Sequence, residues 1–252
     1  MLTDTNVWIG SWPFAKTGIS DISHLSAHLE KEGIDRAWVA PLDAIFYSDC
    51  GIGNDTWLPE ICRHKQLRPV AVINPSMQNW QDTIIKAENE WGVRIIKLVP
   101  GYHLYNLASE NIFACVEYAI KENILISIQI RMEDERRHHP LMKVPSCSID
   151  DIRRLVRRYP ETLFHIASAY FSEAVLLKDL NNIILEISGI EHLDTVNTIG
   201  KYLPYNRLCF GSHTPLYYTR SAILKIQKST CSAEDLEIVK TGGKLRDYLK
   251  NF

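Results

Sequence analysis

The feature that most constrains the fold is a regular alternation of short apolar segments with longer amphipathic ones. Eight apolar segments, rich in β-branched and aliphatic residues, have the length of strands, and amphipathic segments follow each of them. The expected strands are residues 3–8, 36–40, 69–74, 93–99, 125–131, 163–168, 183–188 and 207–213. The expected helices are residues 20–32, 56–64, 80–91, 111–121, 148–159, 172–180, 191–202, 220–227 and 233–249. Strands that alternate with helices form a parallel sheet.

Eight such units in 252 residues predict an α/β fold of one domain, a single (β/α)8 TIM barrel over residues 1–252. A doubly wound open sheet is the alternative. It would normally carry a glycine-rich phosphate-binding fingerprint after an early strand, and this sequence has none. Ser148 is the first residue of one expected helix and Ser232 precedes another, positions where a serine side chain commonly caps the first turn.

Composition narrows the class of protein. Hydrophobic residues make up 46% and charged residues 23%, enough for a sizeable core, and the formal net charge is −2. This charge gives no general attraction to nucleic acid or to anionic membranes, so neither is an expected partner. Six scattered cysteines without metal-site spacing, behind an N-terminus without a leader-like pattern, predict reduced thiols and a cytoplasmic protein.

Polar residues occur at the carboxyl ends of several expected strands, where TIM barrels place their chemistry. Because strand side chains alternate between two faces, the inward-facing set can be read from parity. These residues predict a pocket for a small polar molecule. The expected pocket residues are Asp4, Asn6, Lys97, Tyr102, Gln129, Arg131, Glu186 and His213, with His139 reaching in from the loop after the fifth strand.

Each of these residues also has a purely structural interpretation. Trp8 and Tyr102 would then fill the barrel mouth, and Lys97 would form a buried ion pair with Glu186. The charged residues 133–137 would form a solvated surface run. His165 is expected between the sheet and the helices rather than in the pocket.

Four segments resemble motifs of the amidohydrolase superfamily, in its amidohydrolase-related branch of metal-dependent hydrolases and decarboxylases. Residues 4–10, DTNVWIG, are similar to the opening DxHxHxG strand of that family, and FGSHTP at residues 210–215 is similar to its closing FGSDxP. GVRIIKLVP at residues 92–100 resembles the fourth strand, and TGGKLRDYL at residues 241–249 resembles the terminal helix. The resemblance covers nearly the whole chain and implies a barrel hydrolase or decarboxylase.

The resemblance also implies a metal site, but the residues at its ligand positions have changed. The two histidines of the first strand correspond to Asn6 and Trp8, and the ligand after strand five corresponds to Gln129. The ligand after strand six corresponds to Ser168, with His165 as the alternative alignment, and the strand-eight aspartate to His213. Zinc and related metals prefer imidazole, thiolate and carboxylate ligands. We therefore expect a divergent member with a degenerate metal site and no metal cofactor.

Three functions remain open. The first is a metal-independent hydrolase or decarboxylase of a small anionic substrate, in which His213 is the acid–base group, Asp4 orients it or Asn6, and Arg131 clamps a carboxylate with help from Lys97 and Tyr102. In this interpretation Asn6, Gln129, His139 and Glu186 complete the substrate pocket. The second is an inactive barrel that binds a ligand or a partner. The third retains a divalent metal such as zinc on relocated ligands, His103, His138, His139 and His213 with Asp4 or Asp134. Aromatic residues in the expected loops either cap the pocket or form a dimer interface, and we expect a homodimer; they are Trp12, Phe14, Phe46, Tyr47, Tyr217 and Tyr218.

Overall fold

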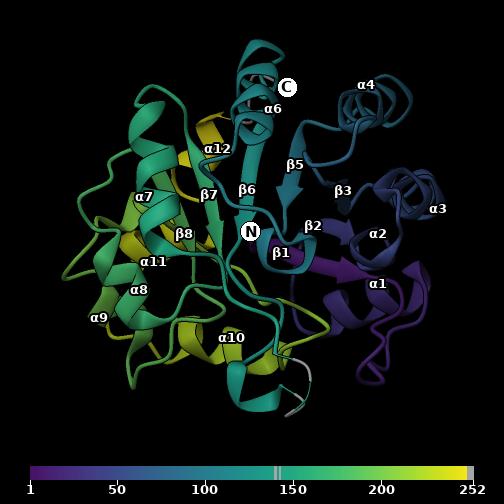
Figure 1. Cartoon of the computed structure of the whole chain (residues 1–252). Coiled ribbons are helices and arrows are strands. Elements are labelled where there is room, and N and C mark those ends of the chain that lie inside the picture. Colours follow the sequence, from purple (N-terminus) through teal and green to yellow (C-terminus); the bar gives the residue numbers. More distant parts are fainter. Residues whose placement is uncertain (139–140, 142, 249–252) are drawn as a thin grey trace.

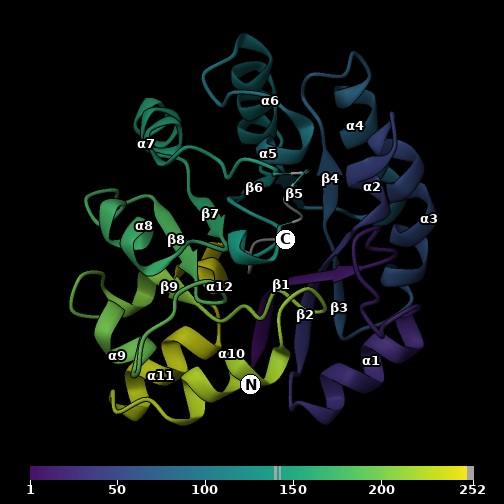
Figure 2. The ribbon, with the colours of Figure 1, turned by 60° about the horizontal axis from the view of Figure 1, so that its bottom comes forward.

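The computed structural model describes residues 1–138, 141 and 143–248 of the chain. Parallel strands form its centre and helices surround them (Figures 1 and 2). The strands are β1 (Thr3–Ile9), β2 (Arg36–Pro41), β3 (Leu67–Pro69), β4 (Ala71–Ile73), β5 (Ile95–Leu98), β6 (Leu125–Gln129), β7 (Phe164–Ala167), β8 (Ile183–Glu186) and β9 (Leu208–Cys209). The α-helices are α1 (Ile22–Lys31), α2 (Asp43–Phe46), α3 (Cys50–Cys62), α4 (Trp80–Trp91), α5 (Pro100–His103), α6 (Glu110–Lys121), α7 (Ile149–Arg158), α8 (Phe171–Leu176), α9 (Thr195–Ile199), α10 (Thr219–Gln227), α11 (Ala233–Lys240) and α12 (Lys244–Tyr248). The predicted α/β barrel is confirmed.

Hydrogen bonds join the strands in chain order around the barrel. They pair in parallel as β1-β2-β3 and as β4-β5-β6-β7-β8-β9. β3 and β4 are two parts of one expected strand, separated at Val70, whose N–H donates to Val39 O at 2.9 Å. On the other side of β1, Thr5 N donates to Phe210 O at 3.0 Å and Trp8 N to Thr214 O at 2.7 Å. The first strand therefore lies beside the last.

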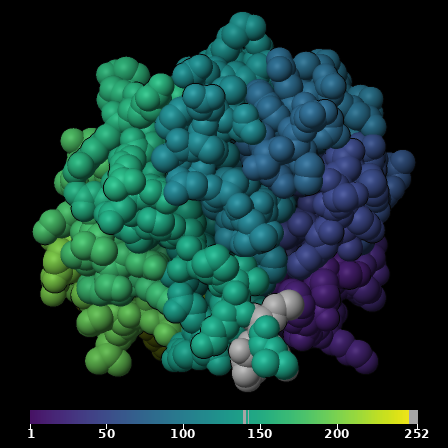
Figure 3. All heavy atoms as spheres, in the orientation of Figure 1, coloured from purple at the N-terminus to yellow at the C-terminus, as the bar shows by residue number. Residues whose placement is uncertain are grey.

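The alternation of strand side chains produces two apolar layers. Side chains such as Val39, Ile96 and Phe164 pack outward against the helices, whereas Trp38 and Ile95 belong to a second cluster inside the barrel. On the face seen in Figure 3, the colours change in sequence order from purple through teal to green, so segments that are neighbours in the chain are also neighbours on the surface. The removal of this apolar surface from water is the main force that holds helices and strands together.

Helix boundaries follow the capping residues. As predicted, Ser148 and Ser232 cap their helices, because their side chains accept from Asp151 N and Asp235 N. Helix α3 begins at Cys50, six residues before the predicted start at residue 56, since Asp49 accepts from Gly51 N at 2.7 Å and provides an earlier cap.

The single predicted helix at 233–249 is wrong, because it is divided into α11 and α12; Leu249 lies outside the described residues. Gly242 and Gly243 between them have φ values of +95° and +55°, which are left-handed conformations that favour glycine. The break turns Leu245 into the cluster inside the barrel. None of the helices in the described part of the chain is both long and apolar enough to cross a membrane.

The side chain of Asn54 replaces backbone hydrogen bonds at an interruption in the sheet. β2 pairs with β3, while β4 pairs with β5, so the hydrogen-bonded ladder is interrupted between β2 and β4. Asn54, fully buried on α3, donates its Nδ2 to Val72 O at 2.8 Å and accepts from Val72 N at 3.0 Å. Its amide thus supplies both backbone partners that Val72 needs.

We predict that Asn54→Ala lowers the free energy of unfolding by about 2–4 kcal/mol, because each buried polar group left unpaired costs about 1–3 kcal/mol. Urea denaturation followed by circular dichroism measures this change. Asp55→Ala, which removes the exposed Asp55–Lys86 ion pair beside it, is the control and should cost less than about 1 kcal/mol. Equal losses in the two variants would contradict a special role for Asn54.

Candidate functional site

The structure brings five of the predicted pocket residues together at the carboxyl ends of the strands. They are Asn6 from β1, Lys97 from β5, Gln129 from β6, Glu186 from β8 and His213 from the segment after β9. None of them is more than 2% exposed. Parity thus predicted correctly that these side chains meet, but they meet in a closed interior rather than in an open pocket.

Lys97 lies among residues that the sequence resemblance aligns with metal-ligand positions. Its Nζ donates to Asn6 Oδ1 at 2.6 Å and to Gln129 Oε1 at 3.5 Å, and lies 4.5 Å from the centroid of the Trp8 ring. The ion pair with Glu186 that a structural interpretation suggested is not formed, since no described carboxylate lies within 4.0 Å of Nζ. Burial lowers the pKa of Lys97 to about 7, although the charges of Glu186 and Asp4 oppose this shift.

Glu186 accepts hydrogen bonds on both carboxylate oxygens. Its Oε1 accepts from Ser188 Oγ at 2.6 Å, from Asn6 Nδ2 at 3.3 Å and from the backbone N–H of Ser168. Its Oε2 accepts from Ser188 N at 2.8 Å. A buried carboxylate with this many donors is well satisfied, so Glu186 serves the interior network and has little capacity left for a ligand.

His213 is held in one neutral tautomer. Its Nε2 bonds to Met132 O at 2.7 Å, and a carbonyl oxygen accepts only, so Nε2 carries the ring proton. The other nitrogen, Nδ1, accepts from Trp8 Nε1 at 3.2 Å and from Asn6 Nδ2 at 3.1 Å. Burial, assisted by the charge of Lys97, lowers the pKa of His213 to about 3. Neither ring nitrogen of His213 is free to exchange a proton with a substrate, as the predicted acid–base role requires. The lowered pKa also differs from the titration near neutrality that the sequence led us to expect.

Asp4 lies beside the network rather than within it. A register shift between Asp4 and Val7 interrupts the alternation of β1. Its Oδ1 accepts from Asn6 N at 3.1 Å and from Ser212 N at 3.0 Å, so it positions the backbone of Asn6 and not the ring of His213. Among the described residues its buried Oδ2 has no partner. Burial raises the pKa of Asp4 to about 7.

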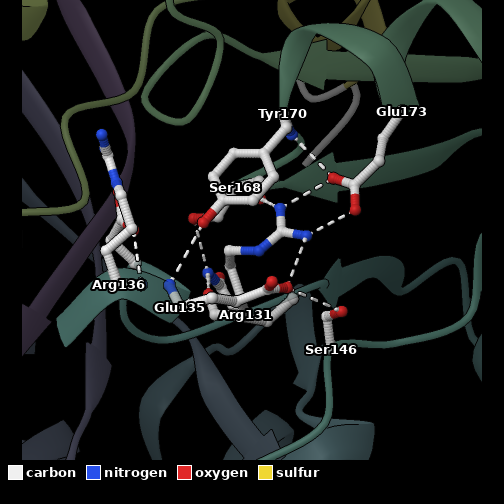
Figure 4. Close-up of polar contacts among 9 residues, drawn as sticks. Arg131, Glu135, Arg136, Ser146, Ser168, Tyr170 and Glu173 are labelled. Atoms are coloured by element: carbon white, nitrogen blue, oxygen red, sulfur yellow. Dashed lines mark hydrogen bonds and ion pairs between the residues drawn. The ribbon is translucent and has the colours of Figure 1, made fainter. Parts of the chain in front are cut away.

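Arg131 already clamps a carboxylate, that of Glu173 (Figure 4). Its guanidinium donates through Nη1 to Glu173 Oε2 at 2.7 Å and through Nη2 to Glu173 Oε1, and Nη1 also donates to Ser168 O at 2.7 Å. The guanidinium carbon lies 3.6 Å from the centroid of the Tyr170 ring. The bidentate geometry predicted for a substrate is formed, but its partner is the protein itself. Sequence reasoning missed Glu173, although a glutamate three residues after Tyr170 at a helix start is a capping signal.

Aromatic side chains cover the mouth above this network. Trp12, Phe14, Phe46 and Tyr102 form an aromatic cluster whose contacting rings have centroids 5.3–5.9 Å apart. Trp12 is 5% exposed and donates its Nε1 to Glu133 Oε1 at 3.0 Å, which ties the first loop to the loop after β6. Tyr102 thus lies in the cover of the barrel. His139 lies outside the described residues.

The expectation that His165 lies between sheet and helices is wrong. Phe164 and Ile166 face the helices, and alternation therefore directs His165 into the barrel. There its Nδ1 bonds to Ser127 Oγ at 2.8 Å, and its ring packs edge-on against Trp38 with centroids 5.6 Å apart. Burial lowers the pKa of His165 well below its usual value.

The donors at the family's ligand positions do not fit a divalent metal. The carbonyl oxygen of Asn6 and that of Gln129 accept from Lys97, Nδ1 of His213 accepts from Trp8 and Asn6, and an indole is not a ligand. Of the relocated ligand set, His139 lies outside the described residues, and His103 Nε2 lies 4.0 Å from Cys50 Sγ, while the ring nitrogens of His213 bond to Met132, Trp8 and Asn6. In the part of the chain that the structure describes, no group of three or more His, Cys, Asp or Glu side chains is placed to hold a metal ion.

Comparison with known proteins identifies similar folds among solved structures. The sequence matches no known protein-family model, and no curated protein is detectably similar to it. Solved structures do match: 5-carboxyvanillate decarboxylase LigW from Sphingomonas paucimobilis (TM-score 0.75, 12% identity, 98% of each chain covered) and 2,6-dihydroxybenzoate decarboxylase from Rhizobium (0.75, 11%, 100% of this chain and 99% of that one). A putative amidohydrolase from Staphylococcus aureus also matches (0.74, 10%, 97% of this chain and 98% of that one).

The resemblance inferred from the motifs is therefore confirmed at the level of the fold. The structure of 5-carboxyvanillate decarboxylase LigW2 from Novosphingobium aromaticivorans contains manganese (TM-score 0.78, 11% identity, 99% of this chain and 97% of that one). This neighbour points toward a divalent metal, whereas the donor set of the present chain does not.

We predict that Asp4 makes stability depend on pH. Because its pKa is 3.8 when unfolded and about 7 when folded, the folded state holds its proton more tightly, and the resulting stabilisation is lost as pH rises from about 4 to about 7. Relative to Asp4→Asn, the wild type should lose on the order of 3 kcal/mol across this window, since one pKa unit corresponds to about 1.4 kcal/mol.

Urea denaturation at half-unit pH intervals measures this difference. Asp150→Asn, which removes the same charge from an exposed position on α7, should follow the wild type within about 0.5 kcal/mol. A wild-type curve parallel to that of Asp4→Asn from pH 4 to 7 would show that Asp4 ionises normally.

Proposed function

We propose that this chain is a binding protein built on a hydrolase or decarboxylase barrel, and that it does not perform the metal-dependent reaction of its structural neighbours. The observation that carries the proposal is the position of Lys97. Its ammonium group contacts Asn6, Trp8 and Gln129, three of the positions that correspond to metal ligands in the family. A cation fixed to the chain thus takes the place in which the family binds an exchangeable one.

The closed mouth supports the same proposal. The network residues are at most 2% exposed, and Arg131 and Glu186 already have intramolecular partners. The cavity bounded by Tyr102, Arg131 and Met132 has a volume of about 10 Å³, about the space of one water molecule. A drug-sized ligand needs several hundred Å³, so this cavity, as the described residues bound it, is too small for a substrate.

The exposed side of the mouth offers a surface for a partner. Phe14, Phe46 and Tyr47 are 38–46% exposed, and Leu104 and Tyr218 about twice that, at 81% and 79%. All five come from segments that follow strands, at one end of the barrel. Exposed apolar side chains gathered in this way commonly mark an interaction site, and we propose a second copy of this chain as the partner.

A metal-independent hydrolase or decarboxylase is the second candidate. It is favoured by the pKa values of Asp4 and Lys97, both displaced to about 7 by burial, because displaced pKa values gather at catalytic sites. This function requires the aromatic cluster to open. The structural neighbours act on aromatic carboxylic acids by name, which makes such acids the substrates to test.

We predict that protein purified without chelator contains far less than one equivalent of manganese or zinc, and that added Mn²⁺ gives no saturable heat in titration calorimetry. Elemental analysis of the wild type and His213→Gln should give the same low content, and a chelator should leave the unfolding temperature unchanged. One equivalent of metal that disappears in His213→Gln would restore the metal-dependent interpretation.

We also predict no release of CO₂ from 2,6-dihydroxybenzoate or 5-carboxyvanillate, with or without Mn²⁺. Turnover that is independent of Mn²⁺ and is lost in Lys97→Met would instead favour the second candidate. The folding of the variant, checked by circular dichroism, keeps this comparison valid.

We predict that the wild type sediments as a dimer and that Leu104→Glu weakens the dimer by about tenfold or more, because a carboxylate in an apolar contact loses its hydration. Analytical ultracentrifugation across a concentration series measures the dissociation constant. Leu176→Glu, at a 53% exposed position on the outer helix α8, is the control and should leave it unchanged. A wild type that stays monomeric would contradict the proposed partner.

A further inference from the structure

A second feature lies at the opposite end of the barrel from the Lys97 network. A cavity of about 700 Å³ opens between the amino-terminal ends of β1, β2 and β3 and residues 241–246, which form a turn and the start of α12. These three strands are neighbours in one sheet (Figure 2). We call this space the basal cavity. Its volume is within the range of about 300–1,000 Å³ that small-molecule sites occupy.

The lining of the basal cavity combines an apolar floor with a cationic rim. Trp38 and Leu245, both at most 5% exposed, belong to the cluster inside the barrel and form the floor. Arg36, Lys65, Arg68 and Arg246 are among the lining residues, and no aspartate or glutamate is among those that the structure describes. The described part of the cavity wall therefore carries several cations and no carboxylate.

Three of these cations differ from the other basic residues nearby. Arg63 pairs with Glu60 and Lys86 with Asp55, whereas within the described chain Arg36, Lys65 and Arg68 have no carboxylate within 4.0 Å.

Arg68 is in addition half-buried, and its environment disfavours its charge. Burial, and then the like charge of Arg36, lower the pKa of Arg68. Like charges in a partly buried wall repel each other unless an anion lies between them. An anion in the basal cavity would remove this cost.

We propose that the basal cavity binds a phosphorylated small molecule, with its phosphate between Arg36, Lys65 and Arg68 and its apolar part against Trp38 and Leu245. Guanidinium groups present paired N–H donors that match phosphate oxygens. A phosphate carries up to two negative charges and therefore compensates the charge of several cations better than a single carboxylate does. The size and floor of the cavity leave room for an aromatic or aliphatic body beside the phosphate.

This inference is independent of the function proposed for the barrel mouth. The basal cavity is lined by the starts of the strands, whereas the Lys97 network lies at their ends. Loss of phosphate binding would leave the metal and dimer experiments unaffected, and the reverse also holds.

The test is isothermal titration of the full chain with four probes: adenosine 5′-monophosphate, inorganic phosphate, adenosine and benzoate. We expect the nucleotide to bind more tightly than inorganic phosphate, and adenosine and benzoate to bind at least about tenfold more weakly than the nucleotide. Arg36→Gln and Arg68→Gln should each weaken nucleotide binding by about tenfold or more, the effect of one lost charge-assisted hydrogen bond.

Arg154→Gln is the matched control, because it removes the same charge from an exposed position on α7 and should not change the affinity. Without ligand, Arg68→Gln should unfold at the same temperature as the wild type or at a higher one, since it removes the repulsion from Arg36. The proposal is overturned if neither phosphate probe binds at millimolar concentration, if benzoate binds as tightly as the nucleotide, or if Arg154→Gln weakens binding as much as Arg68→Gln.

Discussion

A lysine inside a protein needs partners, because no water reaches it to solvate its charge. The ammonium group of Lys97 obtains an acceptor from Asn6, a weaker one from Gln129 and the ring face of Trp8. The other polar groups follow from these contacts. Asn6, having used its oxygen on Lys97, turns its amide toward His213 and Glu186, and His213 then directs its remaining N–H to Met132 O. Each donor thus determines the orientation of the next, and the network holds the ends of five strands in one arrangement.

This arrangement also explains the strained backbone at two of its members. Ser168 and His213 have φ values of +59° and +57°, which are uncommon for residues with a side chain. Such conformations persist where the surrounding structure holds them, and they are concentrated at functional sites. Ser168 and His213 stand at two of the positions that the sequence resemblance aligns with metal ligands. The fold is also shared with the decarboxylase neighbours over nearly the whole chain.

Much of the barrel interior could be predicted from the sequence, because the side chains of a strand alternate between its two faces every two residues. That period predicted that Asn6, Lys97, Gln129 and Glu186 meet inside the barrel. Features that depend on contacts between distant segments were not accessible. Glu173 as the partner of Arg131 and Asn54 as a bridge to Val72 depend on where helices pack. The same is true of the tautomer of His213, which is set by a carbonyl 81 residues away. Capping residues explain why two helix starts were predicted correctly and why an earlier cap, Asp49, displaced a third.

The clamp between Arg131 and Glu173 has a consequence for any ligand that carries a carboxylate. Glu173 is tethered to the same molecule, so it competes with a dissolved acid at an effective concentration on the order of millimolar or higher. It is further held at the start of α8, where Tyr170 N donates to its Oε2 at 2.7 Å. A dissolved acid of similar intrinsic affinity must therefore be present at a comparable concentration to displace it. Glu173 thus acts as an intramolecular competitor that occupies the guanidinium group of Arg131.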